Sequence, residues 1–308
     1  MVDDNLLTMY FIIKTFLFEE RYFLKKPVLK ALILTTGLLG VMGGTASASS
    51  NESDQTTLIV VDKVKEKKLD QRLQALGFPF AELASMPYDM KEHLINQGVV
   101  KYIGTEKREF YYDFDGTLRE KDPSGTGIEG TIDLTDLSLV ITTSQLATMN
   151  SKKRFTVTQK WEWSNTVGLN GDTYLNYVDK IGLSYSNDFD SDPYTNGGYA
   201  CSHSGQHFFS GNHYWLSDCG GRPSDISYGG VGWNVDIRGD YRDYGWSAMN
   251  VVAKNTSDWN TSTRFLTKYA HDTSTSGVGV GLNIGFFSLN FTGNGSWDEG
   301  SAQKTIWY

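Results

Sequence analysis

The chain has 308 residues, enough for a sorting segment followed by one large domain or two small ones. Hydrophobic residues make up 39% of it, charged residues 21% and aromatic residues 13%, which excludes a disordered tail and a multispan membrane protein. The formal net charge is −8, and no block is rich in lysine and arginine. Because binding to phosphate backbones needs a basic surface, this composition argues against nucleic acid as a partner.

The first 48 residues have the features of a secretory signal region. A basic start is followed by an apolar stretch, Ala31–Met42, and by Ala46-Ser47-Ala48. The apolar stretch is shorter than the ~20 residues of a membrane-spanning helix. We therefore expect cleavage after Ala48 and a secreted protein, extracellular or in the cell envelope. Residues 1–23 are acidic and aromatic, and we interpret them as a mis-assigned start, with translation beginning near Leu24.

Residues 49–98 predict a linker and a short helical module. Three leucines recur at helical spacing: Leu69, Leu73 and Leu76. Pro79 and Pro87 suit the first turns of further helices, and Gly98 suits a helix end. We expect two or three short helices. Their apolar side chains are too few for an independent core, so the module should pack on the domain that follows.

Residues 99–308 consist of short runs in which apolar and polar residues alternate. Between Phe155 and Trp163, large side chains alternate with threonine, lysine and glutamate, which is typical of a half-buried antiparallel strand. The runs are not separated by amphipathic helices, which argues against a parallel α/β fold. We predict a mainly β fold, an antiparallel β-sandwich of about nine strands preceded by the helical module.

The chain has two cysteines, Cys201 and Cys219. In an oxidising compartment, a pair at this spacing favours a disulfide. His203, His207 and His213 lie in the same window and leave a Cys/His metal site as the alternative. A second metal hypothesis is calcium, because Asp188, Asp190 and Asp192 occupy alternate positions in a loop and could gather hard oxygen ligands.

The segment Asp113-Phe-Asp115-Gly116-Thr117 resembles the first motif of haloacid-dehalogenase-like phosphatases, in which the first aspartate attacks phosphorus. That fold needs a parallel sheet with helical crossovers, and the sequence after Leu118 is rich in glycine and poor in helix formers. The alternative is a β-hairpin in which Asp115-Gly116 forms the turn, and we favour it.

All eight tryptophans lie in the second half of the chain, among asparagine, glycine, serine and tyrosine. In expected loops, exposed aromatic rings favour ligand stacking, and sugar rings combine apolar faces with hydroxyl groups. We therefore predict a non-enzymatic protein that recognises an extracellular or cell-wall glycan, with no catalytic residues assigned. The five candidate ligand-binding residues are Trp215, Trp233, Tyr241, Tyr244 and Trp246.

Two other functions stay open. Apolar residues alternate with glycine from Val278 and change phase before Phe291, which predicts a strand with a bulge. Such a segment also suits the membrane-inserting hairpin of a secreted toxin or bacteriocin, so membrane contact belongs to this alternative. The other alternative is a secreted hydrolase or metalloenzyme that uses the three clustered histidines.

Overall fold

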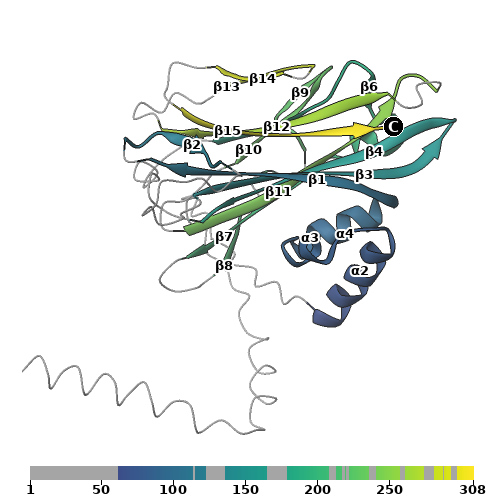
Figure 1. Ribbon diagram of the computed structural model, residues 1–308, viewed down its shortest axis with the longest axis horizontal. Coiled ribbons are helices and arrows are strands. Elements are labelled where there is room, and N and C mark those ends of the chain that lie inside the picture. Colours follow the sequence, from purple (N-terminus) through teal and green to yellow (C-terminus); the bar gives the residue numbers. More distant parts are fainter. Residues whose placement is uncertain are drawn as a thin grey trace, which may run out of the picture. The chain divides into compact units, whose positions relative to one another are not determined.

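The computed structural model of the protein describes residues 62–113, 115–122, 136–164, 179–207, 213–216, 219, 222–235, 241–256, 261–273, 281–286, 288–292 and 297–308. The expected signal region, residues 1–48, lies outside these residues. Within them, short helices are followed by antiparallel strands, which confirms the predicted mainly β fold with a helical start (Figure 1).

Three α-helices come first: α2 (Lys63–Ala75), α3 (Phe80–Ala84) and α4 (Tyr88–Asn96). The strands are β1 (Val99–Tyr112), β2 (Leu118–Glu120), β3 (Leu137–Met149), β4 (Lys152–Trp163), β5 (Asp179–Ser184), β6 (Phe189–Ser191), β7 (Ala200–His207), β8 (His213–Leu216), β9 (Asp225–Ser227), β10 (Gly230–Val235), β11 (Tyr241–Ala253), β12 (Ser262–Asp272), β13 (Gly281–Gly285), β14 (Ser288–Thr292) and β15 (Trp297–Trp307). A short 3₁₀ helix, η1 (Pro193–Gly198), lies between β6 and β7.

The strands form two large antiparallel sheets and a separate hairpin. The eight-stranded sheet has the order β2-β1-β3-β4-β11-β7-β8, with β6 also paired to β11, and the five-stranded sheet has the order β15-β12-β5-β10-β9. The described residues contain fifteen strands against the predicted nine, and three of the additional ones, β2, β6 and β9, have only three residues each. Runs this short carry no readable alternation.

The main core lies between the two sheets. It is built from the inward-facing residues of both, including Trp161 and Trp163 of β4 and Trp233 of β10, all fully buried. Burial of one such side chain stabilises the fold by about 1.5–3 kcal/mol or more. Gln159 of β4 joins the sheets, since its amide donates to Ser247 at 2.6 Å and its carbonyl accepts from Thr267 of β12.

The helices cover part of the outer face of the eight-stranded sheet (Figure 1). Leu73, Leu83 and Leu94 pack with Leu146 of β3 and Trp246 of β11 in a second apolar cluster. Pro79 and Pro87 stand immediately before α3 and α4, where the missing amide hydrogen of proline does not interrupt a helical hydrogen bond. The module therefore has its own buried face against the sandwich.

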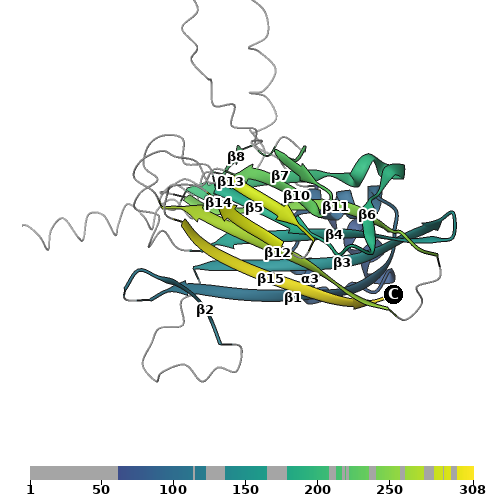
Figure 2. The ribbon, with the colours of Figure 1, turned by 90° about the horizontal axis from the view of Figure 1, so that it is seen from above.

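The hairpin β13–β14 covers the outer face of the five-stranded sheet (Figure 2). The predicted bulge is wrong: the chain reverses after Gly285, and Leu282 pairs with Phe291 across the hairpin. Glycines of the sheet make room for the hairpin, because a Cβ at Gly182 would lie 3.0 Å from Leu289 and one at Gly232 only 2.3 Å from Leu282. The hairpin is not hydrogen-bonded into either large sheet among the described strands.

Candidate functional site

The predicted aromatic residues whose side chains the structure describes, Trp233, Tyr244 and Trp246, do not form an exposed loop surface. Trp233 is fully buried in β10 and Trp246 is 4% exposed beneath the helices, so the prediction that they are loop platforms is wrong. Tyr244 lies half-buried in β11. Trp215 and Tyr241 are in β8 and β11, and their side chains lie outside the described residues.

The three aspartates predicted to bind calcium point to three different partners. Asp188 accepts from the Ser186 hydroxyl at 3.0 Å, and Asp190 lies 3.4 Å from the ammonium group of Lys254. Asp192 is fully buried, and its Oδ2 lies 2.6 Å from Arg154. The calcium prediction is therefore wrong in its geometry, because Asp192 is buried against Arg154 while the Asp190 side chain is 59% exposed and paired with Lys254.

The disulfide prediction is confirmed, and the histidines do not form a metal site among the described residues. Cys201 and Cys219 are bonded, with 5.3 Å between their Cα atoms. His203 is fully buried, and its Nε2 lies 3.0 Å from Asp243 of β11. The side chains of His207 and His213 lie outside the described residues. In the part of the chain that the structure describes, no three His, Cys, Asp or Glu side chains gather as a metal site requires.

The phosphatase-like motif forms the predicted hairpin turn. Asp113 follows β1, and its carboxylate accepts from the amides of Asp115 at 3.0 Å and Thr117 at 2.9 Å. Arg119 of β2 forms an ion pair with the same carboxylate. These contacts lower the pKa of Asp113, with the Arg119 hydrogen bond as the largest cause. The carboxylate thus holds the β1–β2 turn rather than acting as a nucleophile.

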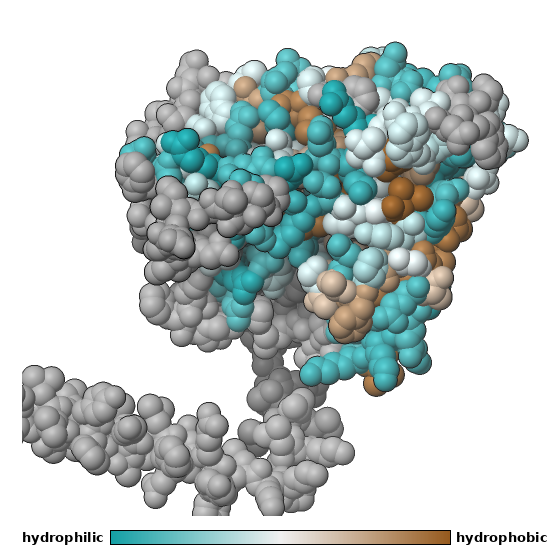
Figure 3. Space-filling view, in the orientation of Figure 1, coloured by the Kyte–Doolittle hydropathy of each residue, from teal (hydrophilic) through white to brown (hydrophobic). Residues whose placement is uncertain are grey.

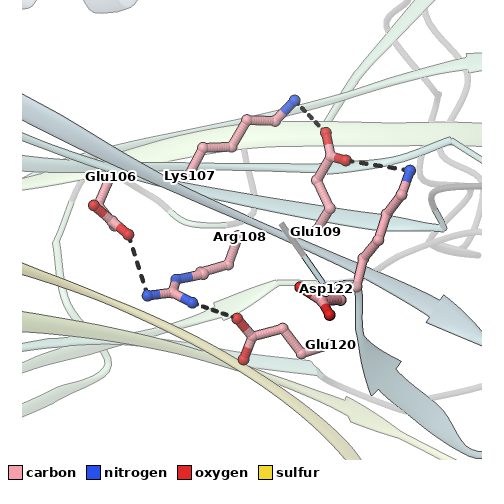
Figure 4. A pocket seen from close by; sticks show the side chains of 7 residues that line it. Glu106, Lys107, Arg108, Glu109, Glu120 and Asp122 are labelled. Atoms are coloured by element: carbon pink, nitrogen blue, oxygen red, sulfur yellow. Dashed lines mark hydrogen bonds and ion pairs between the residues drawn. The ribbon is translucent and has the colours of Figure 1, made fainter. Parts of the chain in front are cut away.

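A hollow of about 330 Å³ beside this turn is lined by charged residues of β1 and β2. Arg108 lies 3.2 Å from Glu106 and 2.6 Å from Glu120. Glu109 pairs with Lys107, and its other oxygen lies 3.6 Å from Lys121 (Figure 4). Because these charges alternate and satisfy one another, the hollow is better explained as a solvated ion-pair ladder than as a binding site.

The strongest candidate site is formed by two adjacent hairpin tips. Tyr228, in the turn between β9 and β10, is 90% exposed, and Phe286, in the turn between β13 and β14, is 40% exposed. Gly229 allows the two turns to approach closely, since a Cβ there would lie 2.4 Å from the carbonyl carbon of Gly285. Ile226 of β9 adds a side chain that is 64% exposed. We call Ile226, Tyr228 and Phe286 the tip patch.

Polar groups lie at the edge of the tip patch. The ammonium group of Lys254 lies 5.3 Å from the centre of the Phe286 ring, a cation–π distance. The same group donates to the side-chain oxygen of Asn187 at 3.1 Å. Asp190 completes the rim through its ion pair with Lys254. The patch therefore combines flat apolar surfaces with donors and acceptors.

A buried tyrosine supports the patch from below. Tyr185 is 3% exposed, and its ring lies edge-on to Phe286 with 6.5 Å between the ring centres. Its amide donates to the carbonyl oxygen of Gly229 at 2.9 Å. Burial raises the pKa of the Tyr185 hydroxyl to about 12, so this hydroxyl stays protonated at physiological pH. Tyr185 thus ties both turns to the core and fixes the orientation of Phe286.

Sequence reasoning missed Tyr228 as a site residue. The signal was present, because Tyr228 precedes Gly229 and Gly230 between two alternating runs, a pattern typical of a tight turn. The prediction was based on the clustering of tryptophans and therefore named Trp233, five residues further on. On the face drawn in Figure 3, hydrophobic residues lie in small groups among hydrophilic ones, so exposure has to be judged one side chain at a time.

The described part of the chain contains no helix that is both long and apolar enough to cross a membrane. The hairpin of the toxin alternative has five residues in each strand, against about 9–11 for a strand that crosses a bilayer. Its apolar residues Leu282 and Leu289 pack on the five-stranded sheet. Val278 and Val280, which the alternative also used, lie outside the described residues.

No protein-family model matches the sequence, and no curated protein matches it. Among solved structures, the chain is similar to the collagen-binding subdomain of the Enterococcus faecalis surface protein ACE (6% identity, 53% of this chain and 92% of that chain, TM-score 0.27). It is also similar to a collagen-binding domain of a Staphylococcus aureus adhesin (8% identity, 52% and 93%, TM-score 0.24). A structure concerning Streptococcus parasanguinis adhesion by Fap1 fimbriae gives 10% identity, 65% and 93%, and a TM-score of 0.27. At TM-scores this low, function has to be argued from the residues of this chain.

Proposed function

We propose that the protein is a secreted, non-enzymatic glycan-binding protein and that the tip patch is its sugar-stacking surface. The observation that carries the proposal is the 90% exposure of Tyr228, in a turn that lies against the turn of Phe286, which is 40% exposed. Large aromatic rings are costly to leave in water. Phe286 stays at the surface with its ring edge-on to the buried ring of Tyr185.

The chemistry of the patch suits a sugar. The C–H face of a pyranose ring packs on an aromatic side chain, and its hydroxyl groups need donors and acceptors within reach. Asn187, Asp190 and Lys254 offer both kinds of group at the rim. The signal-like segment ending at Ala48 and the Cys201–Cys219 disulfide support an extracellular or envelope location, where such ligands occur.

The test is sedimentation of the oxidised, secreted chain with insoluble chitin, cellulose and peptidoglycan sacculi. We expect the wild-type protein to pellet with at least one of them and the Tyr228→Ala/Phe286→Ala double variant to stay in solution. Trp307→Ala is the matched control, because Trp307 is an aromatic residue that is 72% exposed on β15, outside the patch. All three proteins should melt at nearly the same temperature, since the changed side chains are on the surface.

Three outcomes contradict the proposal. Equal pelleting of the double variant and the wild type would remove the patch from the function. Pelleting with lipid vesicles alone would favour the toxin alternative, and release of reducing sugar from a pelleted polysaccharide would favour a hydrolase.

A further inference from the structure

The segment that supports the tip patch continues to a second exposed aromatic ring. It carries Tyr185, which contacts Phe286, and Asp190, which forms part of the rim. It then reaches Tyr194 of η1, which is 45% exposed. Four residue steps separate Asp190 from Tyr194, so their Cα atoms are at most about 14 Å apart. The two aromatic surfaces are therefore neighbours on the protein.

η1 packs on β11 and carries Tyr194 from β6 toward β4. Asp190 of β6 and Arg154 of β4 both pair with Val252 of β11, one on each side of that strand. Because neighbouring strands lie about 4.8 Å apart, the Cα atoms of Asp190 and Arg154 are about 10 Å apart, on one face of the sheet. The Arg154 guanidinium lies 5.6 Å from the centre of the Tyr194 ring. A single pyranose ring is too small to span this distance, whereas successive units of a sugar chain can.

The position of Tyr194 is fixed by contacts within the protein. The side-chain amide of Asn150, in the turn between β3 and β4, donates to the Tyr194 hydroxyl oxygen at 2.5 Å. Arg154, on which the ring lies, donates from two nitrogen atoms to the fully buried carboxylate of Asp192, at 2.6 and 2.8 Å. The same carboxylate accepts from the backbone amide of Tyr194 at 3.0 Å. A ring held in this way loses little conformational entropy when a ligand packs on it.

The surroundings of Tyr194 repeat the chemistry of the tip patch. In both places a cation lies against an aromatic ring and pairs with an aspartate of the same segment, Lys254 with Asp190 and Arg154 with Asp192. Both rings also have side-chain amides beside them. Next to Tyr194 these are the exposed residues Asn150 and Asn196, and an amide side chain both donates and accepts hydrogen bonds.

We infer that Tyr194 forms a second subsite for the glycan chain that packs on the tip patch. The protein then recognises an internal stretch of a polysaccharide, several sugar units long, rather than one terminal sugar. The inference rests on the proposed function for its class of ligand. Two linked contacts make the binding of a long chain tighter than that of a short one, because the second contact forms within the complex.

The test measures affinity against chain length by isothermal titration calorimetry, with oligosaccharides of two to six units prepared from chitin, cellulose and peptidoglycan glycan strands. The wild type should bind the longest member of a recognised series at least tenfold more tightly than the disaccharide. Tyr194→Ala should bind the disaccharide as the wild type does and lose about tenfold in affinity for the hexasaccharide. Unchanged disaccharide binding also shows that the variant is folded.

Two further variants sharpen the test. Tyr194→Phe keeps the ring and should keep most of the gain with chain length. Phe80→Ala is the matched control, because Phe80 is 73% exposed on α3, away from both rings, and it should behave as the wild type. Tyr228→Ala/Phe286→Ala should weaken the binding of every length.

The outcomes separate the two proposals. Equal gain with chain length in Tyr194→Ala and the wild type, or no gain in the wild type, would overturn the second subsite and leave the tip patch standing. A wild type that binds none of the three series would refute the proposed function, and the second subsite with it.

Discussion

The imidazole ring of His93 lies 5.2 Å from the indole ring of Trp246, in the interface between α4 and the eight-stranded sheet. Burial lowers the pKa of His93 to about 4, and no charged partner opposes this shift. The imidazole in the folded protein is therefore neutral at pH values where an exposed histidine already takes up a proton. Docking of the helical module depends on that neutral form.

We expect acid to weaken the fold through His93. Above about pH 6.5 the ring is neutral in both the folded and the unfolded chain. The free energy of unfolding therefore does not depend on pH through His93 in that range. As the pH falls from about 6.5 to 4, only the unfolded chain binds the proton, which costs the folded state up to about 3 kcal/mol. Urea unfolding at a series of pH values measures this, and His93→Phe should flatten the curve over that window. An equally steep decline in the variant would assign the effect to other groups.

A buried carboxylate joins β5 to β12. Asp179 is fully buried and accepts from the Tyr269 hydroxyl at 2.5 Å and from the amide of Asp272 at 2.9 Å. The Nδ1 atom of His271 lies 3.1 Å from the Oδ1 atom of Asp179, which also accepts from the Asp272 amide. Burial and the neighbouring Asp179 raise the pKa of Tyr269, so the hydroxyl keeps its proton.

Asp179→Ala should lower the free energy of unfolding by about 3–5 kcal/mol, because it leaves buried donors without their acceptor. Tyr269→Phe removes one hydrogen bond and should cost about 1–2 kcal/mol. Denaturant unfolding with unchanged slopes provides the measurement. A loss below 1 kcal/mol for Asp179→Ala would mean that the site relaxes or admits water.

Calcium removal should leave the protein unchanged. EDTA is expected to have no effect on the melting temperature, because the carboxylate of Asp192 forms an ion pair with Arg154 and that of Asp190 forms one with Lys254. Arg154→Met, in contrast, leaves a fully buried carboxylate without a countercharge and should cost about 3–5 kcal/mol. A lower melting temperature in EDTA that calcium restores would reinstate a metal site.

The disulfide should contribute about 3 kcal/mol, since it closes a loop of 18 residues in the unfolded chain. Reduction with dithiothreitol under native conditions, followed by denaturant unfolding, tests this value. Cys201→Ser/Cys219→Ser should behave like the reduced protein. Equal stability of the oxidised and reduced forms would show that the bond does not constrain the unfolded state.

The fold was predictable where side-chain periodicity decides burial. Phe155, Trp161 and Trp163 are all inward and at most 1% exposed, as the alternation along β4 indicates. The helical start was equally readable from leucine spacing and from Pro79 and Pro87.

The site was not predictable from the sequence because glycine occurs both in turns and in strands where neighbouring groups pack closely. Trp233 and Trp246 were predicted in loops, and each directly follows a glycine, Gly232 and Gly245; both glycines lie in strands. Gly245 is needed for space, since a Cβ there would lie 2.3 Å from the Trp161 ring. A tryptophan beside a strand glycine is buried, whereas Tyr228, beside a turn glycine, is exposed. The pairing of the strands in the sheet is needed to tell a strand glycine from a turn glycine.

The helical module is joined to the sandwich by a short connection between α4 and β1. Only Gln97 and Gly98 separate the end of the helix at Asn96 from the start of the strand at Val99. The amide of Asn250 in β11 also donates to Gln97 at 2.6 Å. A module that loosened would stay at a very high effective concentration beside its sheet face and rebind faster than any separate protein could arrive. The contact between the helical module and the sheet therefore re-forms after each local opening.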